Sequence, residues 1–162
     1  MTNKLQAPAL DPTTIERVGG SVYPKEHASV CEGRSKARIG NELGLNNFGV
    51  NYVCLEPGSA SSQRHWHHKQ DEFIYIIQGE LTLVTDAGEQ ILQKGMVAGF
   101  PAGKEDGHQL INRSDSNAFY LEVGDRTPGD GAEYPDIDLR VSVDDAGFHF
   151  VHKDGAPYDK AD

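Results

Sequence analysis

The residues with the clearest chemical potential form a histidine-rich block that is followed by a carboxylate. His65 and His67 are separated by Trp66, and Glu72 follows a few residues later. In a β-strand, side chains two residues apart point to the same face, so both imidazoles would be aimed at one point. Glu72 begins an otherwise apolar segment, where a carboxylate is costly unless it is paired or bound to a metal. This block therefore indicates a metal site.

A second block, over residues 95–112, contributes one more histidine, His108, shortly after a turn-forming Pro-Ala-Gly stretch. Three histidines and one carboxylate form a nitrogen and oxygen ligand set that suits a divalent ion such as zinc, manganese, iron or nickel. One or two coordination positions would stay open for water or substrate, as catalytic sites require. We therefore expect one divalent ion, held by His65, His67, Glu72 and His108.

Two features of the first block have alternative interpretations. A pair of histidines alone also occurs on exposed strands that bind no metal, so the prediction depends on the joint pattern of both blocks. Asp71 competes with Glu72 for the carboxylate position. The phase of the following strand favours Glu72, which shares a face with Ile74.

Glu122 is the candidate catalytic group outside the ligand set, within the apolar segment Ala118–Val123. Burial of a carboxylate in such a segment carries a desolvation cost. One interpretation is a carboxylate at the rim, paired with a lysine or arginine. The other is a base near the metal that moves a proton, a role that is open to Glu72 as well. Strand periodicity does not say which face is inward, so both interpretations stay open.

The elements that position these residues are predicted to be short β-strands. Turn residues recur about every eight to twelve positions from Gly40 to Gly124, and no segment there shows a helical period over three turns. Asp86-Ala87-Gly88 predicts a hairpin turn. Many short strands favour an all-β sandwich or barrel. The predicted strands are Phe48–Leu55, Phe73–Ile77, Leu81–Thr85, Glu89–Leu92, Met96–Phe100, Gln109–Asn112 and Ala118–Val123.

The two blocks resemble the two signature motifs of the cupin superfamily, G-x5-HxH-x3,4-E-x6-G and G-x5-PxG-x2-H-x3-N. The resemblance covers about residues 44–124, and it departs from the motifs by longer loops before His65 and His108. Longer strings, such as DEFIYIIQGEL, AGFPAG and GHQLINRSD, resemble bacterial single-domain cupins that are described as sugar-phosphate-isomerase-like. The resemblance implies a double-stranded β-helix barrel of jelly-roll-like form, a metal in its pocket and a homodimer.

The ends of the chain differ from its middle. We predict an N-terminal arm over residues 1–40, a cupin barrel with both metal motifs over residues 41–124, and an acidic C-terminal extension over residues 125–162. The extension holds ten acidic and four basic residues, and its late apolar burst, Phe148–Val151, suggests one more strand or a docked tail.

The composition argues against several classes of partner. The net charge of -10 disfavours nucleic acid and anionic membranes as partners. No apolar run approaches the roughly 18 residues of a membrane span. The first residues carry no apolar signal segment, which predicts a cytoplasmic protein. Cys31 and Cys54 lie far apart in the sequence and are expected to be reduced thiols.

The segment Phe73–Ile77 is apolar on both faces, so something must cover the outside of the barrel. The N-terminal arm, the segment Phe148–Val151 and a second subunit are the alternatives. Together with the resemblance, this pattern predicts a homodimer.

The leading functional hypothesis is a metal-dependent isomerase that acts on a small sugar or sugar phosphate, with the metal polarising a carbonyl group. The alternatives are an Fe(II) dioxygenase that acts on a small metabolite and a non-enzymatic module that binds a small molecule. The fold does not choose among them. The sequence contains no glycine-rich phosphate loop, which weakens the sugar-phosphate hypothesis without removing it.

Overall fold

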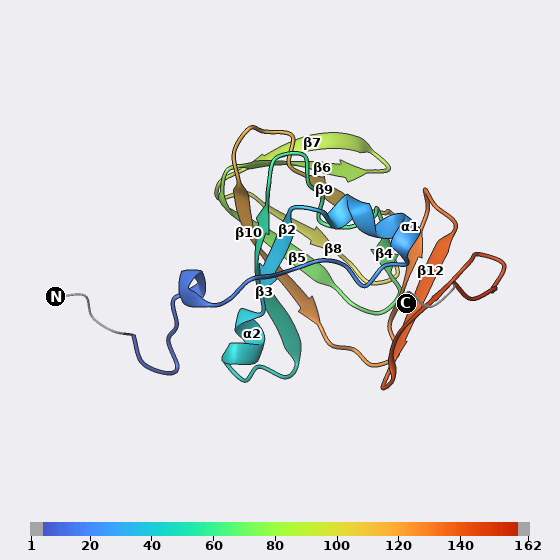
Figure 1. The fold of residues 1–162 in the computed structure, drawn as a ribbon, viewed down its shortest axis with the longest axis horizontal. Coiled ribbons are helices and arrows are strands. Elements are labelled where there is room, and N and C mark those ends of the chain that lie inside the picture. Colours follow the sequence, from blue (N-terminus) through green and yellow to red (C-terminus); the bar gives the residue numbers. More distant parts are fainter. Residues whose placement is uncertain (1–4, 159–162) are drawn as a thin grey trace.

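The computed structural model describes residues 5–158, and its fold is built mainly from short strands (Figure 1). The strands are β1 (Val18–Gly19), β2 (Arg34–Ala37), β3 (Phe48–Leu55), β4 (Trp66–His67), β5 (Glu72–Gln78), β6 (Glu80–Thr85), β7 (Gly88–Gln93), β8 (Val97–Phe100), β9 (Gln109–Ile111), β10 (Ala118–Asp125), β11 (Gly131–Tyr134), β12 (Leu139–Asp144) and β13 (Gly147–Val151). The helical elements are short: α1 (Lys25–Ala28), α2 (Ile39–Glu42) and 3₁₀ turns over Pro12–Thr14 and Ser29–Cys31.

The strands are arranged in three sheets whose pairings are all antiparallel in the described part of the chain. A six-stranded sheet has the order β1-β2-β3-β10-β5-β8, and a three-stranded sheet has the order β7-β6-β9. Neighbours in the larger sheet, such as β3 and β10, are far apart in the sequence. Strands distant in the chain thus become neighbours, as in a jelly roll.

The main hydrophobic core lies between these two sheets. Strands β3, β5 and β10 contribute residues from one side, and β6, β7 and β9 contribute residues from the other. Alternate residues of each strand point inward, which follows from the two-residue period of a strand. The buried residues are Val53, Leu55, Ile74, Ile76, Leu81, Leu83, Leu92, Leu110, Ala118 and Tyr120. The structure is therefore the all-β, jelly-roll-like barrel that the sequence predicts.

The third sheet has the order β13-β12-β11-β4 and includes the strand that carries His67. In Figure 1 its orange and red strands stand beside the barrel. A second apolar cluster, with Ala132, Tyr134, Leu139 and Val141 at its centre, lies within this sheet. The acidic extension is thus folded, and it is paired with the first histidine block.

The predicted strands are found close to their predicted bounds; Phe48–Leu55 matches β3 at both ends. The hairpin predicted at Asp86-Ala87-Gly88 joins β6 to β7, with Gly88 at a φ of 112° that suits glycine. Strand β13 lies over the late apolar burst. The three-part division of the chain stays a prediction, since β2 pairs with β3 and β11 pairs with β4 across its proposed boundaries.

The outer face of β5 is covered at only one end. Ile77 packs against a small cluster that contains Leu10 and Ile15 of the N-terminal part. At the other end, Phe73 and Tyr75 remain 43% and 39% exposed. Within the described part of the chain, the N-terminal arm therefore covers part of this face and leaves an apolar patch uncovered. Among residues 5–158, no helix is long and apolar enough to cross a membrane.

Candidate metal centre

The first histidine block is held between two segments from elsewhere in the chain. β4 pairs with β11, so that His67 lies opposite Ala132. His65 forms an isolated bridge with His108, in which each backbone N–H donates to the other residue's carbonyl, at 3.2 and 2.8 Å. Backbone pairing thus brings the histidine of the second block beside those of the first.

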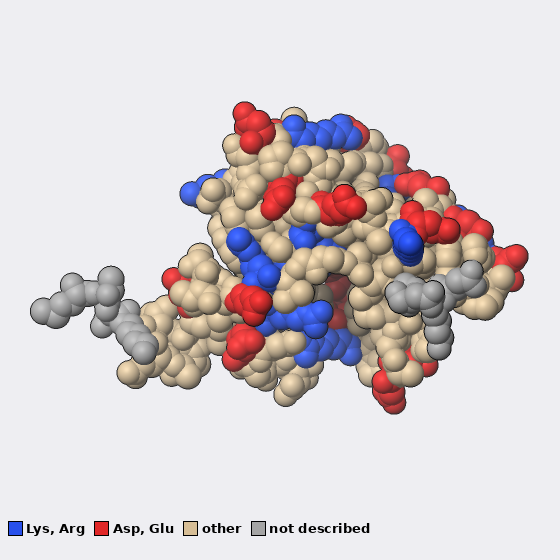
Figure 2. Space-filling model, in the orientation of Figure 1, with Lys and Arg blue, Asp and Glu red and all other residues tan. Residues whose placement is uncertain are grey.

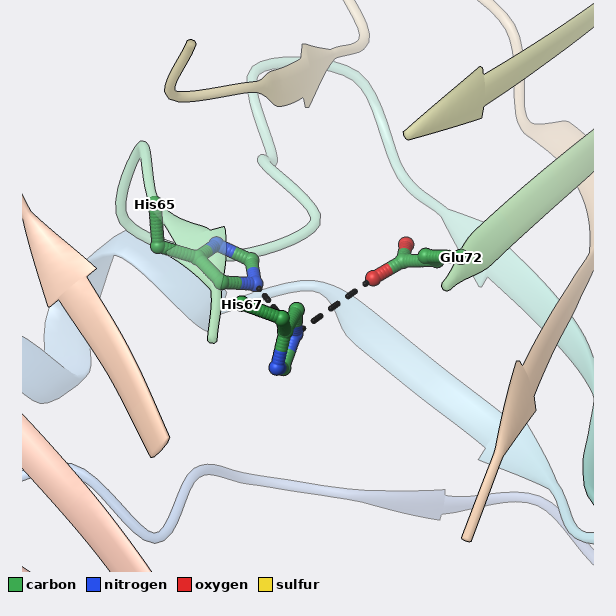
Figure 3. Close-up of side chains that lie close together, drawn as sticks. All are labelled: His65, His67 and Glu72. Carbon is green, nitrogen blue, oxygen red and sulfur yellow. Dashed lines mark hydrogen bonds and ion pairs between the residues drawn. The ribbon is translucent and has the colours of Figure 1, made fainter. Parts of the chain in front are cut away.

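The three side chains His65, His67 and Glu72 converge on one point (Figure 3). The Nε2 atoms of His65 and His67 are 3.2 Å apart, and His67 Nε2 lies 3.7 Å from Glu72 Oε2. One potential ligand atom from each of these three residues lies within 4.8 Å of the other two. This spacing lets one ion contact all three.

His108 lies directly beside this group. Its Nε2 atom is 3.5 Å from Glu72 Oε2, and its ring centre is 4.8 Å from that of His65. The ring stacks on Phe100 at 3.6 Å and is 4% exposed, yet neither ring nitrogen has a hydrogen-bond partner among the described residues. Buried polar atoms normally have a partner. An ion among the four residues would provide one, so the residues present fit a divalent metal.

The electrostatics of the cluster also fit a cation. Burial and the neighbouring His108 lower the pKa of His65 to about 3, which keeps the ring neutral, as a metal ligand requires. Burial alone would raise the pKa of Glu72, but contacts with His108, His65 and His67 lower it to about 2. The site therefore offers a neutral imidazole and an ionised carboxylate at neutral pH.

The competing candidate Asp71 and the neighbouring His68 have other contacts. Asp71 Oδ1 accepts a hydrogen bond from the backbone N–H of Ala102 at 2.8 Å. His68 lies on the opposite side of β4 from the cluster, and its Nε2 atom is 3.5 Å from Glu133 Oε1. Neither contact is with the cluster of Figure 3.

Glu122 lies on the inward face of β10, two residues from the buried Tyr120 and opposite the core residue Ile74. Its Oε1 and Oε2 atoms accept hydrogen bonds from Lys36 Nζ at 2.7 and 2.9 Å, and Oε1 also accepts one from Asn51 Nδ2 at 2.9 Å. The structure thus combines a feature of each interpretation, a lysine partner and an inward position.

The residue that sequence reasoning missed is Asp130. Its Oδ2 atom is 2.7 Å from His67 Nδ1, and its side chain is 3% exposed. Tyr134, on the same strand region, stacks on His65 with ring centres 5.6 Å apart. Both lie in the acidic extension, where no pattern distinguishes Asp130 from the surrounding solvated acids.

A cavity of about 230 Å³ opens beside the cluster, with His67 and His108 in its wall. The other walls are largely apolar and include Trp66, Leu83 and Phe100. Elsewhere, between the barrel and the C-terminal sheet, Figure 2 shows a hollow with acidic atoms inside and basic side chains along one rim. The cavity lined by His67 and His108 therefore gives the site space that a small molecule could enter.

Comparisons with known proteins agree with this geometry. A family model described as a cupin domain matches residues 51–124. A solved structure from Silicibacter pomeroyi, described as a sugar phosphate isomerase from a cupin superfamily, is 49% identical, with a TM-score of 0.90 over 94% of this chain and 98% of that one.

Two more distant structures share the fold. A protein from Acidithiobacillus ferrooxidans is 24% identical, with a TM-score of 0.71 over 79% of this chain and 81% of that one. A polyketide cyclase from Streptomyces resistomycificus is 16% identical, with a TM-score of 0.58 over 74% and 80% of the two chains. No curated protein matches the chain significantly.

Proposed function

The chain belongs to the cupin superfamily, and we propose that it is a metal-dependent isomerase that acts on a small sugar or sugar phosphate. The observation that carries the proposal is the convergence of His65, His67 and Glu72 beside the ring of His108, whose nitrogens have no hydrogen-bond partner within residues 5–158. The similarity to the Silicibacter pomeroyi protein supports the reaction class. These four residues would hold one divalent ion, and its identity is open among zinc, manganese, iron and nickel.

The ion, when bound, would supply Lewis-acid polarisation of a substrate carbonyl. An isomerase of this kind also needs a base that takes a proton from one carbon and returns it to the next. Glu122 is our candidate, because Oε1 is occupied by two donors whereas Oε2 accepts only from Lys36 among the described residues. Oε2 therefore retains a lone pair for a substrate proton, and Lys36 keeps the carboxylate in place. Glu72 is the alternative base.

The cavity supports a small substrate. Its volume of about 230 Å³ is below the roughly 300–1,000 Å³ of pockets for drug-sized ligands. Lys104 lines it and is 64% exposed, at 3.6 Å from Asp106, so it is available for a phosphate group at the mouth. Comparison of a sugar with its phosphate ester as substrates decides between the two classes.

The test of the reaction uses deuterium exchange. Isomerisation through an enediolate in D₂O incorporates deuterium from solvent at the carbon that is reprotonated, and NMR detects it in each candidate aldose or ketose. Glu122→Gln should retain the metal and lose the exchange. Glu133→Gln is the matched control, since Glu133 is a half-buried carboxylate paired with Arg140. Exchange that is unchanged in Glu122→Gln would overturn the assignment of the base.

The test of the metal is elemental analysis of protein purified without chelators or a metal-affinity column. We expect about one divalent ion per chain, as for a mononuclear site. His67→Ala should lose most of it while the barrel stays folded. Zinc or manganese supports the isomerase; iron without any exchange activity would favour the dioxygenase instead.

We also propose that the uncovered patch on the outer face of β5 and β8 is the interface of a homodimer. Tyr75 and Val97 are paired neighbours on these strands, and Val97 is 53% exposed. An exposed apolar patch of this kind is typical of a surface that is covered in an assembly. Light scattering should give twice the chain mass of 17.7 kDa. A monomer at micromolar concentration would contradict the proposal.

A further inference from the structure

The C-terminal sheet reaches the candidate metal centre through one buried carboxylate. Asp130 lies just before β11, which pairs with the strand of His67. Its Oδ2 atom is 2.7 Å from His67 Nδ1, and its Oδ1 atom accepts a hydrogen bond from the backbone N–H of Lys69 at 2.8 Å. Both carboxylate oxygens are thus engaged with the histidine block.

The close approach of β11 to its other neighbour in the sheet, β12, depends on Gly131. A Cβ atom at this position would lie 2.6 Å from the carbonyl oxygen of Val141 and 3.1 Å from Nδ1 of His68. The first of these contacts is shorter than real Cβ atoms show, so a glycine is needed beside Asp130 for β11 to lie against β12. The position of Asp130 is therefore built into the strand pairing.

The hydrogen bond between Asp130 and His67 determines which ring nitrogen of His67 has a lone pair available for a metal. An ionised carboxylate can only accept, so in the neutral ring that a metal ligand requires, Nδ1 carries the hydrogen and Nε2 keeps its lone pair. That Nε2 atom faces His65 Nε2 at 3.2 Å and Glu72 Oε2 at 3.7 Å. The partner on one side of the ring thus selects the tautomer that can ligate a metal on the other side.

We propose that Asp130 is a positioning residue of the metal centre: it holds His67 in the Nδ1–H tautomer and fixes the ring with Nε2 toward the ion. The inference rests on the proposed metal site and extends it to a residue outside the matched cupin domain, residues 51–124. The acidic extension is then part of the site. Tyr134, stacked on His65, gives the extension a contact with the second histidine of the block.

The chain contains a control that makes the same pair of contacts at an exposed position, since the Asp138 side chain is 62% exposed. Asp138 Oδ1 accepts from the backbone N–H of Lys153 at 2.8 Å, and Asp138 Oδ2 is 2.9 Å from His152 Nδ1. The same two contacts are thus made, but His152 is not part of the metal cluster. If the carboxylate only stabilised a loop, its replacement should have the same effect on metal affinity at Asp130 as at Asp138.

The experiment compares Asp130→Asn with Asp138→Asn. An asparagine has one acceptor oxygen for two donors, so either the Lys69 or the His67 contact is lost. We expect Asp130→Asn to raise the Kd for Zn²⁺, measured by chelator competition, about 10- to 100-fold. Asp138→Asn should leave the Kd unchanged within about threefold. Equal Zn²⁺ affinity in Asp130→Asn and the wild type would overturn the inference, whereas a wild type without affinity for Zn²⁺, Mn²⁺, Fe²⁺ or Ni²⁺ would overturn the metal site itself.

A second measurement does not depend on the folding of a variant. ¹⁵N NMR of the Zn²⁺-loaded wild type should show His67 with hydrogen on Nδ1 and the metal on Nε2. Coordination through Nδ1 would overturn the inference even if Asp130→Asn does not fold.

Discussion

Replacement of His108 distinguishes most sharply between a structural and a metal-binding role of this residue. His108 is buried, and neither of its ring nitrogens has a hydrogen-bond partner among the described residues. We consider the replacement His108→Leu, measured with and without metal. In the metal-free protein, leucine removes two unsatisfied polar atoms, each costing about 1–3 kcal/mol. It also loses the stacking on Phe100 and fits the space less well, at about 1–3 kcal/mol. These opposing effects should leave the metal-free free energy of unfolding between about 1 kcal/mol below and about 5 kcal/mol above that of the wild type.

The metal-loaded protein should respond differently. Zn²⁺ at 100 times its Kd stabilises a protein that binds one ion by about 2.7 kcal/mol. For a chain of this size, about 2–4 °C of Tm corresponds to each kcal/mol, so the wild type should gain about 5–11 °C. His108→Leu should lose most of this gain.

Thermal unfolding followed by circular dichroism, with Zn²⁺ or with a chelator, measures both states. His149→Leu is the control, since His149 is half-exposed and paired with Asp144 away from the cluster, and it should keep the full gain. A full metal-dependent rise in His108→Leu would refute the ligand assignment. A loss of more than about 4 kcal/mol without metal would instead show that the ring is structural, as for a residue that fills the core.

Three further outcomes follow from buried or paired groups. Asn112 makes four hydrogen bonds with the chain around it, so Asn112→Ala should lower the free energy of unfolding in urea by about 2–4 kcal/mol. Burial raises the pKa of both the Cys31 and the Cys54 thiol, so neither should react with Ellman's reagent at pH 7 until the protein is denatured. The hydrogen bond from Arg64 lowers the pKa of Asp136, so its stabilisation is present above pH 4 and is lost on acidification below it. Because the carboxylate is largely exposed, Asp136→Asn should reduce the fall in the free energy of unfolding at acidic pH by less than about 1 kcal/mol.

The sequence by itself determined the barrel strands and the nearness of His65 to His67. Both follow from the two-residue period of a strand, which is a local property of the backbone. Strand phase also favoured Glu72 over Asp71 as the residue at the site, and the structure directs the Asp71 carboxylate to a backbone N–H instead. The strand prediction succeeded because it needed no knowledge of which strands are neighbours; the choice of Glu72 as a ligand stays a prediction.

Only the tertiary structure determined which residues from distant parts of the chain contact the site. Asp130 reaches His67 because β11 pairs with β4 across more than sixty residues of chain, and no local pattern encodes that pairing. Likewise, periodicity left open which face of β10 is inward. The pairing of β10 between β3 and β5 determined that the face with Glu122 is inward and that Lys36 lies against its carboxylate. A period of two defines two faces of a strand equally well; only packing against the rest of the chain makes one of them the inside.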